Sequence, residues 1–247
     1  MTQEAVLITG GTSGIGRATA ELLHERGVRV MVTASSNESV AAARAQLPEE
    51  IVVVRADTAS LDDTARVVQE AEAAFGMLTG LFLNAGIFSA SPIEAVDEAT
   101  WNRLFEVNAK GQFFTLQKAL PLLTDGASVV VTVGIGATRG MAGSGVAAGS
   151  RGALLTMIPS FAIELAPRGI RVNAVSPGAI DTPIMGKTGL PPEQVTAVKQ
   201  GMAAGIPFQR LGEAREVATT VAFLLSDDAS YITGENVVVG GGAGLRF

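Results

Sequence analysis

The residues best suited to do chemistry lie near the start of the chain, in the segment Thr9–Gly16. Its glycines Gly10, Gly14 and Gly16 follow an apolar run, Ala5–Thr9, and precede an amphipathic stretch. Glycines permit a tight turn and let backbone N–H groups approach a phosphate, and the N-terminus of a following helix adds partial positive charge. The order strand, glycine turn, helix is far more specific than a lone glycine run. The segment therefore predicts a turn that holds the pyrophosphate of a dinucleotide.

Composition limits what else the 247 residues can do. There is no cysteine and only one histidine, so we expect no disulfide, no thiolate chemistry and no metal site. The formal net charge of −6, without long runs of charge, argues against nucleic-acid and membrane partners. No targeting segment is visible, so a cytoplasmic protein is the expectation.

Apolar runs of strand length alternate with amphipathic stretches of helical length along the chain. The runs are nearly continuous in Val, Ile and Leu, as strands covered on both faces must be. The expected strands are Ala5–Thr9, Val28–Thr33, Ile51–Ala56, Leu78–Leu83, Ser128–Val133, Ile170–Val175 and Asn236–Val239. The clearest expected helices are Asp62–Phe75, Glu94–Leu123, Ser150–Ala166 and Glu213–Leu225, and Pro159 should kink the third or end its first half. This alternation predicts an α/β fold, a Rossmann-type doubly wound parallel sheet of about seven strands with helices on both faces.

A single domain, 1–247, is expected, because no linker-like change of composition interrupts the alternation. Two connections are long. Gly134–Gly152 is rich in Gly, Ala and Ser and lies between a strand and a helix, which favours an ordered active-site loop over a flexible linker. The stretch at about 181–206 is rich in Pro and Gly and is expected to be a substrate-lobe insertion, such as a lid.

Further landmarks follow the expected strands in order. They are Asp57, Asn84-Ala85-Gly86, Asn108, Pro177-Gly178, Thr182 and Tyr231-Ile232-Thr233-Gly234. Together with the spacing of the three glycines, they resemble the short-chain dehydrogenase/reductase family over essentially the whole chain. The resemblance implies an oxidoreductase that uses NAD(P)(H) on a small carbonyl or alcohol substrate, assembled as a homo-oligomer, a tetramer.

The resemblance also implies which residues bind the cofactor. Asp57 would meet the adenine, and Asn84–Gly86 would pack against the adenosine ribose. The nicotinamide would be held by the segment that includes Pro177, Gly178 and Thr182. The full expected set is Gly10, Thr12, Ser13, Gly14, Ile15, Gly16, Ser35, Ser36, Asp57, Thr58, Asn84, Ala85, Gly86, Arg151, Pro177, Gly178, Ile180 and Thr182.

The end of the second strand bears on the choice between NAD and NADP. An acidic residue there would bind the ribose 2′-hydroxyl, and an arginine would bind a 2′-phosphate. The sequence has Ser35 and Ser36 instead, with Glu38 as the first acid, although Ser13 stands where NADP-using relatives often carry a base. Nothing repels a 2′-phosphate, and two hydroxyls can donate to it, as in the similar stretch of NADPH-dependent 3-oxoacyl carrier-protein reductases. We therefore expect NADP(H) in preference to NAD(H).

The family's proton-transfer residues are replaced. The family pattern has an Asn in the long helix, a Ser after the fifth strand, a Tyr, and a Lys four residues later that lowers the pKa of the Tyr. Asn108 matches the first, but Gly134, Ala147 and Arg151 stand at the other three positions. No tyrosine lies anywhere in 128–168. Arg151 can hydrogen-bond ribose hydroxyls but cannot act as a base near neutral pH, so weak or atypical catalysis is expected.

Three functions therefore stay open from the sequence. The first is an oxidoreductase that works through unusual residues. The second is a catalytically inactive nucleotide-binding sensor or hetero-oligomer partner. The third is a non-redox enzyme on the same fold. The enoyl-reductase spacing, with Tyr seven residues before Lys, does not restore the site, because it lands on Ser144.

Overall fold

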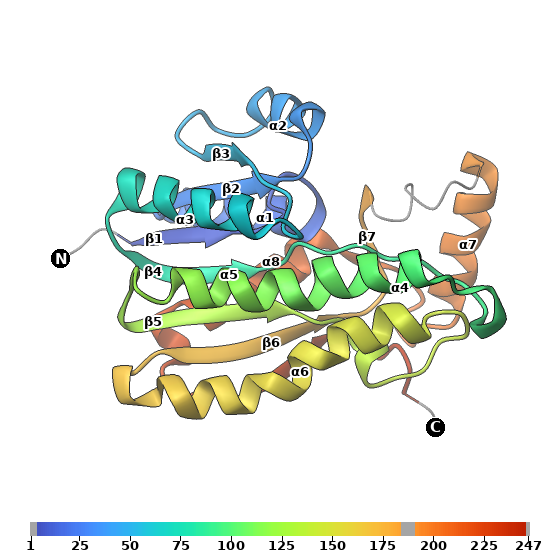
Figure 1. Cartoon of the computed structure of the whole chain (residues 1–247). Helices are drawn as coiled ribbons and strands as arrows, with labels where there is room; N and C mark the ends of the chain where they lie inside the picture. The colour runs from blue at the N-terminus through green and yellow to red at the C-terminus, as the bar shows by residue number, and fades with distance from the viewer. Residues whose placement is uncertain (1–3, 184–190, 246–247) are drawn as a thin grey trace.

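The computed structural model describes residues 4–183 and 191–245. Seven parallel strands form one sheet in the order β3-β2-β1-β4-β5-β6-β9 (Figure 1). They are β1 (Ala5–Ile8), β2 (Arg29–Ala34), β3 (Val52–Arg55), β4 (Leu78–Leu83), β5 (Leu123–Thr132), β6 (Arg171–Pro177) and β9 (Asn236–Val239). A separate ribbon pairs β7 (Ile180–Asp181) with β8 (Gly212–Glu213). The predicted doubly wound, Rossmann-type parallel sheet is confirmed.

Helices cover both faces of the sheet, because each strand points alternate side chains to opposite sides. In β1, Leu7 packs in a cluster with apolar side chains of α3, α5 and α6, whereas Val6 and Ile8 pack with α1 and α8. Figure 1 shows α3, α5 and α6 in front of the sheet and α8 behind it. The α-helices are α1 (Gly14–Glu25), α2 (Asn37–Arg44), α3 (Leu61–Phe75), α4 (Glu98–Phe105), α5 (Gln112–Ala119), α6 (Gly145–Leu165), α7 (Pro192–Ala204) and α8 (Ala214–Leu225).

The strand order reverses between β1 and β4. From β1 the chain builds outward through β2 to β3 and then crosses to β4 on the other side of β1. Ligands of open parallel sheets bind outside the carboxyl ends of the strands at such a point. The glycine turn follows β1 here, and Asn84–Gly86 follows β4. The fold therefore places the two predicted cofactor segments side by side.

The expected helix Glu94–Leu123 is wrong in extent. Helix α4 ends at Phe105, a π-helical segment Glu106–Gly111 follows, and β5 already begins at Leu123. A π segment widens the helix locally and re-aims the side chains on it, and such segments are frequent at functional sites. This one contains Asn108.

Helix α6 begins earlier than expected. The sequence predicted a loop through Gly152 and a helix over Ser150–Ala166, but the helix starts at Gly145 and continues through Pro159. Buried apolar side chains on either side of the proline, Ile158 and Ala162, hold this part of the helix against the sheet. The positions of Ala147 and Arg151 therefore lie in the first two turns of a helix rather than in a loop.

Two helices were not foreseen. Helix α2 is short and rich in alanine, and α7 lies within the expected insertion at about 181–206. The two strands of the β7–β8 ribbon flank the insertion: β7 lies at its N-terminal end, and β8 follows its C-terminal end. Residues 184–190 of the insertion lie outside the described residues, so the lid expected there is not tested.

The outer face of α6 mixes exposed apolar side chains, Met157 and Ile163, with the polar side chains of Ser160 and Glu164. With the short turn after it, Gly145–Arg168 is the one segment among the described residues that is long and apolar enough to cross a membrane, by length and composition only. Of the most apolar stretch, 28% is buried, and Ile163 is 75% exposed. Length and composition alone do not separate a membrane helix from a helix that packs on another subunit.

Candidate cofactor-binding site

The glycine turn has the backbone geometry that the sequence predicted. Gly10 has φ +63° and Gly14 has φ +54°, in the left-handed region that favours glycine. A Cβ at Gly16 would lie 2.4 Å from the carbonyl oxygen of Gly10. Helix α1 starts with no acidic residue in its first turn, and its N-cap Ser13 makes no capping bond. The first-turn N–H groups, which have no intrahelical acceptor, fit a phosphate group.

The other residues predicted for this turn divide by environment. Ser13 is exposed and Thr12 is partly exposed, so both are open to a ligand. The side chain of Ile15 instead packs against the core on the α1 side of the sheet, so Ile15 can contribute only its backbone to the site.

The loop Asn84–Gly86 is tied to the glycine turn by hydrogen bonds. Asn84 Nδ2 donates to the carbonyl oxygen of Gly10 (3.0 Å), and Thr132 Oγ1 donates to Asn84 Oδ1 (3.1 Å). The hydroxyl oxygen of Thr9 accepts the N–H groups of Asn84 and Ala85, both at 3.0 Å. The two loops therefore behave as one rigid edge.

The end of β2 presents one uncommitted hydroxyl. Ser36 caps α2 by accepting the N–H of Ser39 (3.1 Å), and it also donates to Ser39 Oγ (3.0 Å). Thr33 Oγ1 accepts the N–H of Gly10 (3.2 Å). Ser35 is exposed and makes no side-chain hydrogen bond within the described parts of the chain. Of the two serines predicted to face a 2′-phosphate, Ser35 is the one with its hydroxyl free to donate.

Asp57 lies at the end of β3 with its carboxylate held in place. Its Oδ2 pairs with Arg103 of α4 (3.2 Å), and its Oδ1 accepts the N–H of Ala59 (3.0 Å). The N–H of Asp57 donates to Asp63 (2.9 Å), and this bond is the main cause that holds the pKa of Asp63 below its ordinary value. Thr58 beside it is buried. The acidic group predicted to meet an adenine is thus oriented by a partner that the sequence did not indicate.

Asn108 is fully engaged by protein groups. Its Nδ2 donates to the carbonyl oxygen of Ile87 (2.9 Å) and to Ser150 Oγ (3.0 Å), and its Oδ1 accepts the N–H of Ile87 (2.8 Å). The Ser150 hydroxyl donates to the carbonyl oxygen of Ala147 (2.8 Å). Neither side chain has a proton left to give to a substrate in this arrangement. They lock α6 to the loop after β4.

Arg151 reaches under the same loop. Its Nη1 donates to the carbonyl oxygen of Thr132 (2.7 Å), and its Nη2 lies 3.1 Å from the carbonyl oxygen of Ala85 and 3.4 Å from that of Asn84. No carboxylate within 4–183 or 191–245 forms an ion pair with it. Burial lowers the pKa of Arg151 to about 10, so it stays charged at neutral pH. The guanidinium pins the ends of β4 and β5 together.

Gly134 has a backbone that a serine would not adopt. Its φ is +91°, in the region that L side chains rarely occupy, although the nearest atom to an added Cβ, the Pro177 carbonyl oxygen, lies 3.9 Å away. The obstacle is therefore backbone conformation and not lack of space. Ala147 is buried, with 5% of its surface exposed. Gly134, at the family position for Ser, thus lacks the side chain and has a backbone that favours glycine, whereas Ala147, at the family position for Tyr, lies in regular helix and lacks only the side chain.

The segment after β6 meets the glycine turn from the other side. A Cβ on Gly14 would lie 3.2 Å from Thr182 Cβ, so Thr182 borders the turn. Pro177 ends β6, and the N–H of Gly178 donates to the last residue of β9 (2.8 Å). Ile180 is buried at the start of β7. The predicted nicotinamide segment is therefore positioned next to the predicted pyrophosphate segment.

A cavity of about 320 Å³ lies beside the site and not in it. Among the predicted residues only Ile180 lines it within the described chain, and its other walls come from β9, α8 and the residues before β8. Arg210 and Glu216 form an ion pair there (2.7 Å), and bonding by Arg210 lowers the pKa of Glu216 to about 2. The two charges neutralise each other.

Sequence reasoning missed two polar residues behind the site, Thr9 as a side chain and Gln112. The sequence analysis includes Thr9 in the glycine-turn segment but assigns no role to its side chain. Gln112 is completely buried at the start of α5. The signal that could have found it is an uncharged polar residue four positions after Asn108, followed directly by Phe113 and Phe114.

The contact between Gly86 and Arg151 generates a stability prediction. A Cβ at residue 86 would lie 1.5 Å from Arg151 Nη2, so Gly86→Ala should destabilise the protein by about 1–3 kcal/mol through overpacking. In an Arg151→Ala background the clash with the guanidinium is gone and only the 3.0 Å approach to Asn108 Oδ1 remains, so the same change should cost much less. Urea unfolding of the wild type, both single variants and the double variant measures this coupling. Gly140→Ala, where nothing lies within 4 Å, is the control, and additive effects would contradict the contact.

Comparisons with known proteins agree on one family. The model of the family described as Enoyl-(Acyl carrier protein) reductase matches residues 10–244. Levodione reductase of Leifsonia aquatica is 35% identical, over 100% of this chain and 96% of the relative. Cyclohexanol dehydrogenase of Acinetobacter sp. is 36% identical, over 96% and 94%. A 3-oxoacyl-[acyl-carrier-protein] reductase of Staphylococcus aureus is 35% identical, over 98% of each chain.

Solved structures are equally similar. The crystal structure of levodione reductase has a TM-score of 0.90 at 34% identity, over 98% of each chain. A blue fluorescent protein from a metagenomic library, solved in complex with NADPH, has a TM-score of 0.89 at 31% identity, over 97% of each chain. These matches span nearly the whole chain and agree with the glycine turn and the strand order described above. The chain belongs to the short-chain dehydrogenase/reductase family.

Proposed function

We propose that this protein binds a nicotinamide dinucleotide and is an oxidoreductase of weak or atypical activity towards a carbonyl or alcohol. The observation that carries the proposal is the intact edge at the strand reversal. The glycine turn, the loop Asn84–Gly86 and Thr182 meet there, and α1 begins at the glycine turn with no side-chain cap from Ser13 on its first-turn N–H groups. A pyrophosphate fits such an edge, because it needs N–H donors, close backbone approach and partial positive charge.

We propose NADP(H) as the preferred form. No acidic residue stands at the end of β2, and the hydroxyl of Ser35 is exposed and uncommitted there. A carboxylate at this place would repel a 2′-phosphate, whereas a hydroxyl can donate to it. The NADPH complex of the metagenomic relative is compatible with this preference.

We propose that the activity is weak because the usual donor for proton transfer is missing. A bound nicotinamide supplies the hydride, which needs position more than a protein group. At the position of the family Tyr the chain has Ala147, and the nearby hydroxyl of Ser150 already donates to a carbonyl oxygen. Arg151 keeps its proton at neutral pH. Loss of a positioned general acid typically costs about 10²–10⁴ in rate.

A second candidate is a cofactor-binding protein without turnover, either a sensor or an inactive partner in a mixed oligomer. The geometry of Arg151 favours it. The guanidinium donates to backbone carbonyls at the end of β5 and in the loop after β4, so it stabilises the cofactor edge and not a reacting oxygen. The two candidates agree on cofactor binding and differ in turnover.

Cofactor binding is the first test. Titration calorimetry of the wild type should show binding of NADP(H), with NAD(H) weaker. Gly16→Asp should abolish it, because a side chain there meets the Gly10 carbonyl oxygen at 2.4 Å and adds negative charge beside the pyrophosphate. Gly201→Ala, on α7 with nothing within 4 Å, is the control. Absence of binding of either cofactor to the wild type would end this proposal.

Catalysis is the second test. Cofactor oxidation with cyclohexanone and activated ketones should be slow in the wild type. Ala147→Tyr combined with Arg151→Lys should raise it by about 10²-fold, because Tyr supplies a proton donor and Lys lowers its pKa from ~10. Each single change should do little, since groups that act as a unit are not additive.

The same assay tests the backbone of Gly134. Adding Gly134→Ser to the double variant should lower stability without a further gain in rate, because φ is +91° there. Robust wild-type turnover that Ala147→Tyr leaves unaltered would show that another residue transfers the proton.

We also propose that the outer face of α6 packs on a second copy of this chain, within a homotetramer. Met157 and Ile163 are 37% and 75% exposed on that helix, and large exposed apolar side chains gather at interfaces. Light scattering at micromolar concentration should report a tetramer, and Ile163→Glu should weaken it. A monomeric wild type would refute the assembly.

A further inference from the structure

Gln112 is buried where three parts of the site meet. It is the first residue of α5, directly after the π segment, and it has 0% exposure. Its Nε2 donates to the carbonyl oxygen of Ala85 (2.6 Å) and lies 3.4 Å from that of Val107, in the π segment. Its Oε1 accepts the hydroxyl proton of Thr9 (3.2 Å). One amide therefore joins the end of β1, the loop after β4 and the bulged helix.

The bond to Thr9 decides what the Thr9 hydroxyl can do. Its oxygen accepts the N–H groups of Asn84 and Ala85, and its single proton goes to Gln112. A hydroxyl has one proton to donate and two lone pairs, so all its capacity is used. Without Gln112 the proton would have no acceptor in this arrangement, and the rotamer that serves the two N–H groups would lose its anchor.

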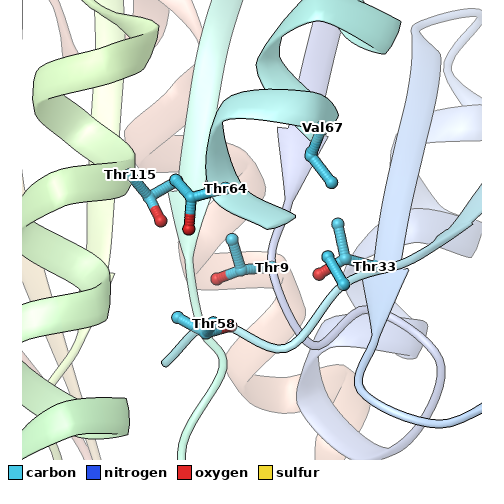
Figure 2. Close-up of a pocket in the computed structure, with 7 residues that line it drawn as sticks. Thr9, Thr33, Thr58, Thr64, Val67 and Thr115 are labelled. Carbon is cyan, nitrogen blue, oxygen red and sulfur yellow. The ribbon is translucent and has the colours of Figure 1, made fainter. Parts of the chain in front are cut away.

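The hydrogen bond between Thr9 and Gln112 matters because there is free space beside the side chain of Thr9. A cavity of about 10 Å³, near the size of one water, borders the side chain. Figure 2 shows Thr9 in the middle of this pocket, with α3 above it and Thr115 coming from the green helix α5. The wall consists of Thr9, Thr33, Ala56, Thr58, Thr64, Val67 and Thr115. A Thr9 released from Gln112 has room to turn, which a close-packed core would deny it.

The carbonyl of Ala85 is held from two sides. Gln112 Nε2 lies 2.6 Å and Arg151 Nη2 lies 3.1 Å from its oxygen, so both lone pairs are occupied. Gln112 reaches it from the side of Thr9, and Arg151 reaches it from α6 and from the end of β5. The orientation of the peptide between Ala85 and Gly86 is thereby fixed.

We propose that Gln112 is a positioning residue for the cofactor site. Its side-chain amide sets the glycine turn and the loop Asn84–Gly86 in register with each other, and so sets the affinity for the dinucleotide. The proposal rests on the cofactor binding proposed above for that edge. Gln112 itself has no exposed surface and acts through Thr9 and Ala85.

Two variants and one control test this role. Gln112→Leu removes both the donor and the acceptor at similar size. Gln112→Met removes both groups as well and follows the unbranched shape of the glutamine side chain. Thr115→Val is the matched control, because Thr115 lies on the same helix, is equally buried, and bonds only to the carbonyl oxygen of Gly111 among the described residues. Two readouts are needed: the Kd for NADPH, and hydrogen exchange of the peptide that covers 82–88.

Gln112→Leu should weaken NADPH binding by about 10-fold, as expected for the loss of two buried hydrogen bonds. It should also speed exchange of the amides of Asn84 and Ala85, whose acceptor is Thr9. Gln112→Met should shift both readouts in the same direction as Gln112→Leu, and Thr115→Val should leave both near the wild type. If Gln112→Leu does not fold, the result for Gln112→Met decides.

Unchanged affinity and unchanged exchange in the Gln112 variants would overturn the proposal. Equal effects in Thr115→Val would overturn it as well, because they would reflect general destabilisation. If the wild type does not bind NADPH, the proposed function fails, and exchange of the segment 82–88 still tests the positioning of the loop by Gln112.

Discussion

Hydrogen bonds that centre on one hydroxyl, that of Thr9, join the loops that follow β1 and β4. Parallel strands bring their carboxyl ends to one edge of the sheet, but nothing in a parallel sheet fixes the loops beyond that edge. Here Thr9 accepts two N–H groups of the β4 loop, and Asn84 donates back to the glycine turn. The glycine turn, the predicted ribose loop and the bulged helix all depend on this contact. It converts two loops into a surface that can bind a pyrophosphate.

Much of the fold and part of the site follow from the sequence. Continuous Val and Ile runs predict all seven strands of the large sheet, since strands covered on both faces need apolar side chains on both sides. The glycine turn can also be predicted from local sequence, because glycine readily adopts φ values such as the +63° of Gly10 and other residues rarely do. The early start of α6 at Gly145 was missed, and the kink or break expected at Pro159 gives way to a continuous helix, because the buried side chains of Ile158 and Ala162 hold it against the sheet. Tertiary packing of that kind has no local signature.

The site residues divide in the same way. The spacing places Arg151 at the family position of Lys, but the sequence does not tell which groups its guanidinium contacts. The guanidinium donates to three backbone carbonyls, and this depends on the distance between α6 and the ends of β4 and β5. The partner of Asp57, Arg103, belongs to a helix far along the chain and could not be chosen from sequence among the basic residues. Composition alone, by contrast, excludes a catalytic tyrosine in 128–168.

The left-handed backbone of Gly134 also constrains how this sequence can change over time. With φ at +91°, any side chain at this position first meets a conformational penalty, before it can contribute a hydroxyl to a reaction. Restoring a serine here therefore costs stability unless other substitutions also move the start of the loop into ordinary backbone geometry.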